Sequence, residues 1–178
     1  YKNNKRWRYK KLAAMKIKEI KRMVVKIGSS LIVDNDKGVD VKFLNNIGED
    51  ILSLRKKGIE TLIVSSGAIE LGKIELKKTK EKLNLSENQA ASSIGQIKLI
   101  NAWKEALKKF GLNAAQILIT AEDTENRKRF LNARSTIEEL IYERYIPIIN
   151  ENDTVATSEI KYGDNDRLAA RIAGMFSA

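Results

Sequence analysis

Short apolar segments rich in β-branched residues alternate along this chain with longer segments whose apolar residues follow a helical period. The apolar segments are residues 23–27, 61–64, 114–119 and 146–149. The helical segments are residues 39–57, 86–110, 126–144 and 166–176. Because consecutive parallel strands are joined by a crossover helix, this order predicts an α/β fold with right-handed crossovers and a mainly parallel sheet.

Two of these segments carry more specific predictions. The helix over residues 86–110 is expected to bury the face formed by Ile97, Ile100, Trp103, Leu107 and Phe110. The last apolar segment contains the only proline, Pro147. We expect it near the start of its strand, because a proline in mid-sheet cannot donate a ladder hydrogen bond.

Composition removes several classes of chemistry. The chain has 178 residues, 43% of them apolar, which is enough for one sizeable core. It has no apolar run of the roughly 18 residues that a membrane helix needs. It has no Cys, and therefore no disulfide or thiolate site, which is compatible with a cytoplasmic location. It also has no His, so any catalysis must use Lys, Arg, Asp, Glu, Ser and the backbone.

The positive charge is concentrated at the start of the chain. The net charge is +10, and residues 1–22 hold ten Lys or Arg and a single acid, Glu19, so residues 23–178 are almost neutral. We interpret residues 1–22 as a disordered extension or upstream sequence, and residues 23–178 as the folded part. We expect nucleic-acid binding only as a non-specific property of this basic segment, through phosphate groups.

Polar side chains gather where the strands are expected to end. They are Lys26, Gly28 and Ser29 at the first strand, Ser66 after the second, and Asn150, Asp153, Asp164, Asn165 and Asp166 after the fourth. The carboxyl ends of parallel strands share one edge, where α/β proteins bind ligands, so we expect a single site there. Glycines and a lysine suit a phosphate, and acids with amides suit an amine-bearing ligand or a metal. Asn, Asp and Gly are also typical of solvated turns, and the residues alone leave both interpretations open.

Six motifs occur in the order found in one enzyme family. They are residues 25–30 (VKIGSS), 64–69 (VSSGAI), 94–96 (IGQ), 129–134 (RFLNAR), 147–156 (PIINENDTVA) and 163–166 (GDND). Through them, residues 23–178 resemble the glutamate 5-kinase family of the amino acid kinase superfamily. The resemblance implies a three-layer α/β/α sandwich around a mainly parallel sheet. It also implies ATP-dependent phosphorylation of the γ-carboxylate of L-glutamate, the first step of proline biosynthesis.

The resemblance assigns roles to individual residues. Lys26 is similar to the lysine that meets the transferred phosphoryl group, and Asp166 to the acid that positions this lysine. Gly28 and Ser29 would shape the phosphate loop. The implied glutamate ligands are Ser66, Asn150, Asp153, Asp164 and Asn165. The implied cofactors are ATP and Mg²⁺, with the metal bound through the nucleotide and no metal site on the protein. A γ-carboxylate is already ionised at neutral pH, so the absence of His is no objection.

The resemblance covers only the N-terminal, glutamate-binding portion of the family's kinase domain, so we expect a fold truncated at its C-terminal end. It implies L-glutamate and ATP as partners, a homo-oligomer at full length, and no membrane association. Two alternatives stay open. One is a kinase for another acid, such as aspartate or N-acetylglutamate, and the other is an inactive fragment or a basic-tailed binding module.

Overall fold

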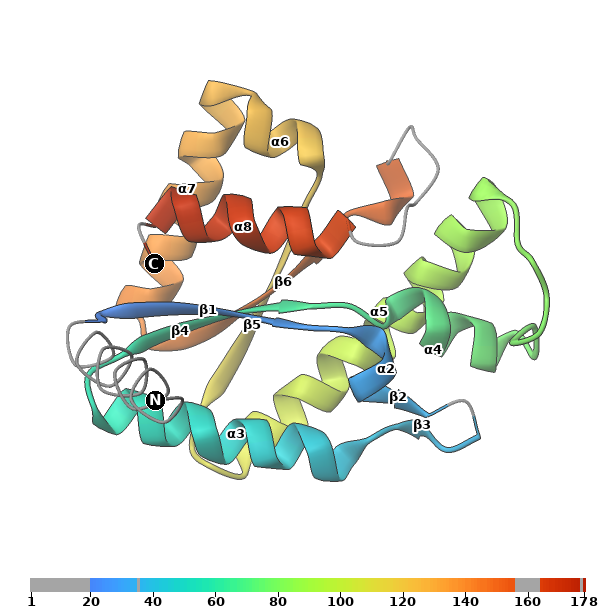
Figure 1. Cartoon of the computed structure of the whole chain (residues 1–178), viewed down its shortest axis with the longest axis horizontal. Helices are drawn as coiled ribbons and strands as arrows, with labels where there is room; N and C mark the ends of the chain where they lie inside the picture. Colours follow the sequence, from blue (N-terminus) through green and yellow to red (C-terminus); the bar gives the residue numbers. More distant parts are fainter. Residues whose placement is uncertain (1–19, 35, 156–163, 177) are drawn as a thin grey trace, which may run out of the picture.

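A four-stranded parallel sheet forms the centre of the computed structural model, which describes residues 20–34, 36–155, 164–176 and 178. The strands are β1 (Arg22–Ile27), β4 (Glu60–Ser65), β5 (Asn113–Ile119) and β6 (Tyr145–Glu151). Their order across the sheet is β1-β4-β6-β5, and each neighbouring pair is parallel (Figure 1). The predicted parallel sheet is confirmed.

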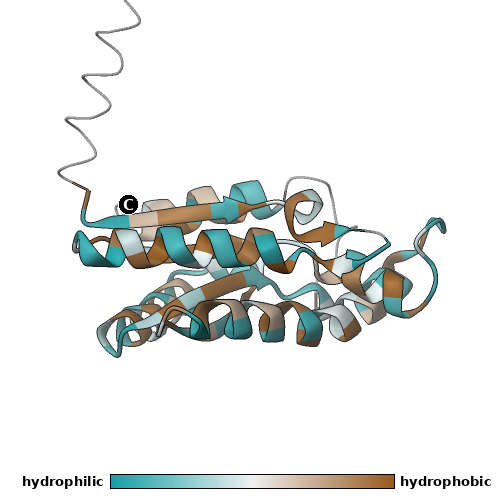
Figure 2. Ribbon diagram, turned by 90° about the horizontal axis from the view of Figure 1, so that it is seen from below, coloured by the Kyte–Doolittle hydropathy of each residue, from teal (hydrophilic) through white to brown (hydrophobic). Residues whose placement is uncertain are grey.

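Helices cover both faces of this sheet. Helices α3 (Val41–Lys56) and α5 (Leu85–Lys108) lie on one face, and α7 (Arg127–Tyr142) and α8 (Asp164–Phe176) lie on the other (Figure 1). Successive strand side chains point to opposite faces, so Ile63 packs against the first pair of helices and Leu62 against the second. Figure 2 shows hydrophobic positions along the strands and alternating hydrophobic and hydrophilic positions along the helices. The three-layer α/β/α arrangement is therefore confirmed.

The strand order explains which helix covers which face. The connections β1 to β4 and β4 to β5 run in one direction across the sheet, whereas β5 to β6 runs back. Right-handed crossovers that run in opposite directions place their helices on opposite faces. Helix α5, which follows β4, and helix α8, which follows β6, also lie on different faces, and a crevice opens at the carboxyl ends of these two strands.

Several short elements join the main ones. They are α2 (Ser29–Ile32), the antiparallel pair β2 (Val33–Asp34) and β3 (Gly38–Val39), α4 (Ala68–Glu75), α6 (Ala121–Glu125) and the 3-10 helix η1 (Asp153–Val155). Helix α5 begins at a capping box, in which the Asn84 side chain accepts from the Glu87 backbone and the Glu87 side chain accepts from the Asn84 backbone. The hydrogen bond from the Asn84 backbone, and then that from Lys78, hold the pKa of Glu87 below its usual value. The start of the longest helix is thus fixed by its own sequence.

Pro147 lies where the sequence predicts, and the predicted face of α5 is confirmed except at Ile97. Pro147 is the third residue of β6, and the pairing of β6 with β4 begins only at Ile148. The prediction that Ile97 faces the core is wrong, because this side chain is 65% exposed. Trp103 and Leu107 are buried as predicted, and Ile100 and Phe110 pack against the core. The buried face also includes Leu99 and Gly95, and Gly95 brings α5 close to α4.

Two other predictions concern the first residues of the chain. Strand β1 begins at Arg22, one residue earlier than expected, and Arg22 pairs with Glu60. The proposed extension falls on residues 1–22, of which residues 1–19 lie outside the described part of the chain. Among the helices that the structure describes, none combines the length and apolar character needed to cross a membrane.

Candidate functional site at the strand ends

A cleft of about 440 Å³ lies at the carboxyl ends of β1, β4 and β6. Eight of the nine predicted site residues line it: Lys26, Gly28, Ser29, Ser66, Asn150, Asp153, Asn165 and Asp166. Asp164 begins helix α8, but its side chain lies outside what the structure describes. Residues that are far apart in the sequence therefore meet at one edge of the sheet.

Lys26 enters the cleft from the end of β1. Its neighbour Val24 packs against the α7 and α8 face, and Lys26, two residues further on, points to the same face. The Lys26 Nζ lies 2.8 Å from the Asp166 Oδ1 at the start of α8. A Cβ added to Gly28 would lie 3.7 Å from this Nζ, so the glycine keeps the space beside the ammonium open.

Ser66 enters the cleft from the turn after β4. The Ser66 backbone N–H donates to the Ile27 carbonyl at 3.0 Å, which ties this turn to the end of β1. Gly67 follows with a φ of 115°, a conformation that favours glycine. The Ser66 hydroxyl accepts a hydrogen bond of 2.8 Å from the Asn165 side chain.

Asn150 and Asp153 are polar residues buried at the end of β6. Asn150 is 3% exposed and Asp153 is 7% exposed. The Asn150 Nδ2 donates to the Gln96 Oε1 at 2.8 Å, and the Asn150 Oδ1 accepts from the Asn165 Nδ2 at 3.3 Å. Buried polar groups are normally hydrogen-bonded, and both the nitrogen and the oxygen of the Asn150 carboxamide are.

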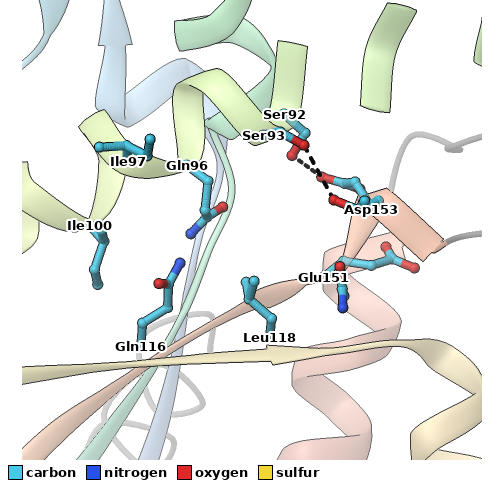
Figure 3. A pocket seen from close by; sticks show the side chains of 11 residues that line it. Ser92, Ser93, Gln96, Ile97, Ile100, Gln116, Leu118, Glu151 and Asp153 are labelled. Atoms are coloured by element: carbon cyan, nitrogen blue, oxygen red, sulfur yellow. Dashed lines mark hydrogen bonds between the residues drawn. The ribbon is translucent and has the colours of Figure 1, made fainter. Parts of the chain in front are cut away.

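The Asp153 carboxylate is held by helix α5. The Ser92 hydroxyl donates to the Asp153 Oδ2 at 2.5 Å, and the adjacent Ser93 Oγ lies 3.3 Å from the Thr154 Oγ1 (Figure 3). These contacts link α5 to η1. The same four residues also line a second cavity of about 280 Å³, and this cavity shares Glu151 and Asp153 with the main cleft.

The sequence did not assign a role to two residues that hold the site together, Ser92 and Gln96. Both lie on α5, one helical turn apart; Gln96 bonds to Asn150 near the end of β6, and Ser92 bonds to Asp153 just after it. Gln96 belongs to the motif at residues 94–96, and this motif could have marked it as a site residue. Ser92 carried only a weak signal, a polar residue on a helix face that also contains Ala91 and Gly95.

The charges around the cleft suit a ligand that carries both signs. Lys26 and Lys73 line it together with Glu70, Glu151, Asp153 and Asp166. Acids can pair with an ammonium group, and lysines can contact phosphate or carboxylate oxygens. The described residues contain no group of three acids placed to hold a metal ion.

Comparison with known proteins extends these observations. Residues 21–178 match the amino acid kinase family. The chain is 53% identical over 168 residues to the glutamate 5-kinase of Bradyrhizobium diazoefficiens, which covers 94% of this chain and 45% of that protein. It is 54% identical over 163 residues to the glutamate 5-kinase of Brucella abortus, which covers 92% of this chain and 43% of that protein. The chain thus spans less than half the length of these relatives. The match over residues 21–178, together with the parallel sheet and its strand-end cleft, shows that the chain belongs to the amino acid kinase family.

Proposed function

We propose that the protein containing this chain transfers the γ-phosphoryl group of ATP to the γ-carboxylate of L-glutamate, the first step of proline biosynthesis. The observation that carries the proposal is a single cleft that joins the Lys26–Asp166 pair to Ser66, Asn150, Asp153 and Asn165. The name that the relatives bear, glutamate 5-kinase, supports the same activity. Because the chain spans only 43% to 45% of these relatives, the proposal concerns the protein at full length.

The amide and acid side chains would bind glutamate. Asp153 pairs with the substrate ammonium, and Ser66, Asn150 and Asn165 contact its polar groups; Asp164 is assigned to the same set. The γ-carboxylate, with a pKa of about 4.3, is ionised at neutral pH, so no base has to remove a proton. One of its oxygens attacks the γ-phosphorus, the bond from that phosphorus to the bridging oxygen breaks, and ADP leaves with the electron pair.

Lys26 would stabilise the charge that develops on the transferred phosphoryl oxygens. Asp166 keeps the ammonium in position, since the two groups lie 2.8 Å apart. Gly28 and Ser29 form the adjacent loop, where the missing side chain of Gly28 leaves room for a phosphate group. Mg²⁺ bound through the nucleotide would neutralise phosphate charge. We further propose that the full-length enzyme is cytoplasmic and forms a homo-oligomer.

Two isosteric substitutions in the full-length protein test the division of roles. Asp153→Asn removes a charge while the Ser92 hydroxyl can still donate to the amide oxygen. The KM for glutamate should rise by roughly a hundredfold, the usual cost of breaking a desolvated ion pair, and the KM for ATP should hardly change. Asp166→Asn should instead lower kcat more than it changes the KM for glutamate. The γ-glutamyl phosphate is measured as its hydroxamate after trapping with hydroxylamine.

Asp50→Asn, on the exposed side of α3 and outside the cleft, is the matched control and should leave both constants unchanged. A KM for glutamate that stays within about twofold in Asp153→Asn would remove Asp153 from the site. A higher kcat/KM for aspartate or N-acetylglutamate would assign a different substrate. No transfer to any of the three acids would overturn the kinase proposal.

A further inference from the structure

Helix α5 sends two polar side chains into the site from one face. Ser92 and Gln96 are four residues apart, so they lie one above the other on the helix. Ser92 bonds to Asp153, and Gln96 bonds to Asn150. Figure 3 shows both residues projecting from α5 toward the strand ends. The role of Gln96 extends beyond packing, because it ends a chain of carboxamides.

Three side-chain amides form a directed relay across the crevice. The Asn150 Nδ2 donates to the Gln96 Oε1 at 2.8 Å. The Asn165 Nδ2 donates to the Asn150 Oδ1 at 3.3 Å and to the Ser66 Oγ at 2.8 Å. A carboxamide has a donor side and an acceptor side, so the orientation of each amide fixes that of the next.

The direction of the relay decides which group Asn165 offers to a ligand. Its Nδ2 is occupied by two acceptors, and its Oδ1 is buried with no hydrogen-bond partner among the described residues. A buried acceptor without a donor is costly, and an N–H group of a ligand would relieve that cost. With the amides reversed, Asn165 would offer a donor instead, which would repel an ammonium group.

The Gln96 end of the relay carries the direction seen in the structure. The relay ends on the other side at the Ser66 hydroxyl, which can either donate or accept and therefore imposes no orientation. Gln96 accepts from Asn150 and so keeps the Asn150 oxygen turned toward Asn165. The adjacent Gly95, where a Cβ would lie 1.8 Å from the Ala68 carbonyl oxygen, holds the backbone that carries Gln96 close to α4.

We infer that Gln96 is a positioning residue, which orients Asn150 and Asn165 so that the site offers an oxygen acceptor to the substrate ammonium. This inference rests on the proposed function, since it takes glutamate as the ligand. Gln96 itself does not touch the substrate. Its substitution should therefore affect the binding of glutamate and leave phosphoryl transfer almost unchanged.

Three substitutions of Gln96 in the full-length protein separate the effect of its hydrogen-bond acceptor from the effect of its side-chain shape. Gln96→Met keeps the length of the side chain and removes the acceptor, and should raise the KM for glutamate about tenfold with kcat within about threefold. Gln96→Glu can only accept, and should keep that KM within about threefold of the unsubstituted value. Gln96→Lys can only donate, and should raise the KM at least as much as Gln96→Met. Gln116→Met, at an exposed position of β5 beside Gln96, is the matched control and should change neither constant.

Thermal unfolding of each variant accompanies the kinetics. If Gln96→Met fails to fold, the contrast between Gln96→Glu and Gln96→Lys still decides the question. Equal KM values for these two variants, or an unchanged KM in a folded Gln96→Met, would overturn the inference while glutamate turnover continued. Absence of glutamate turnover in the unsubstituted protein would overturn the proposed function instead.

Discussion

At the scale of single residues, the Lys26–Asp166 ion pair holds the Lys26 ammonium in one direction but contributes little to the stability of the fold. The two side chains are 31% and 64% exposed. Pairs this exposed usually contribute less than about 1 kcal/mol, because water and salt screen them. The pair is therefore better explained by the direction in which it holds the Lys26 ammonium than by stability.

Replacing Lys26 tests this explanation. In the full-length protein, Lys26→Ala should lower kcat about 10²- to 10³-fold, the effect of losing one preorganised electrostatic donor. The KM for glutamate and the midpoint of thermal unfolding should change little. Steady-state kinetics measure the first two quantities, and Lys42→Ala on the exposed side of α3 is the control. An unchanged kcat would show that Lys26 is an ordinary strand-end lysine with no role in phosphoryl transfer.

Ser92 offers a second test at this scale. Ser92→Ala removes the hydroxyl that donates to a carboxylate that is only 7% exposed. We expect it to lower the free energy of unfolding by about 1–3 kcal/mol and to raise the KM for glutamate. The neighbouring Ser93 is exposed, and Ser93→Ala should stay within about 0.5 kcal/mol of the parent. Urea unfolding measures both, and equal losses in the two variants would contradict the role given to Ser92.

At the scale of elements, the crossing of α4 and α5 depends on two glycines. A Cβ on Gly72 would lie 1.8 Å from the Ala91 carbonyl oxygen, and a Cβ on Gly95 would lie 1.8 Å from the Ala68 carbonyl oxygen. Both clashes are with backbone atoms, which cannot move aside as a flexible side chain can. The close approach brings α5, with Ser92 and Gln96, onto the turn that carries Ser66.

Alanine substitutions measure this approach. Gly72→Ala and Gly95→Ala should each lower the free energy of unfolding by about 3 kcal/mol or more, because the two helices must separate. Gly174→Ala in α8 is the matched control, since its Cβ would meet no described atom within 4 Å. It should raise stability by up to about 1 kcal/mol, the difference in helix propensity. Denaturant unfolding with a destabilisation below 1 kcal/mol at Gly95 would contradict the close packing.

The same glycines explain the one residue of the predicted α5 face, Ile97, that is exposed rather than buried. A hydrophobic period gives weight to the largest apolar side chains, and so selected Ile97. Where α4 and α5 approach closely, the small residues Ala91 and Gly95 face the neighbouring helix, and Ile97 is left 65% exposed.

At the scale of the whole molecule, charge is distributed very unevenly along the chain. Residues 1–19 contain eight of the 33 Lys and Arg residues and only one of the 23 acids. Arg22 belongs instead to the fold, since it pairs with Glu60 and stacks over the Phe176 ring at 5.1 Å. A truncation that respects the fold therefore ends before residue 20.

Removing residues 1–19 from the full-length protein should weaken non-specific DNA binding and flatten its dependence on salt, because fewer phosphate contacts release fewer counterions. Glutamate kinase kinetics and the unfolding midpoint should not change. Fluorescence titration of labelled DNA at several salt concentrations provides the measurement. Tight, salt-sensitive binding by the truncated protein would place the basic surface within the folded part.

The amino-acid sequence by itself determined the layer architecture, the main strands and helices, and the residues that gather at the strand ends. These features depend on local periods, on turn residues and on short motifs, all of which are contained in neighbouring residues. Only the tertiary structure decided the strand order, the exposure of Ile97 and the contacts of Ser92 and Gln96. The Ser92–Asp153 and Gln96–Asn150 bonds join residues 61 and 54 positions apart. Such contacts exist only after distant helices and strands have packed, and no local pattern records how closely two backbones approach.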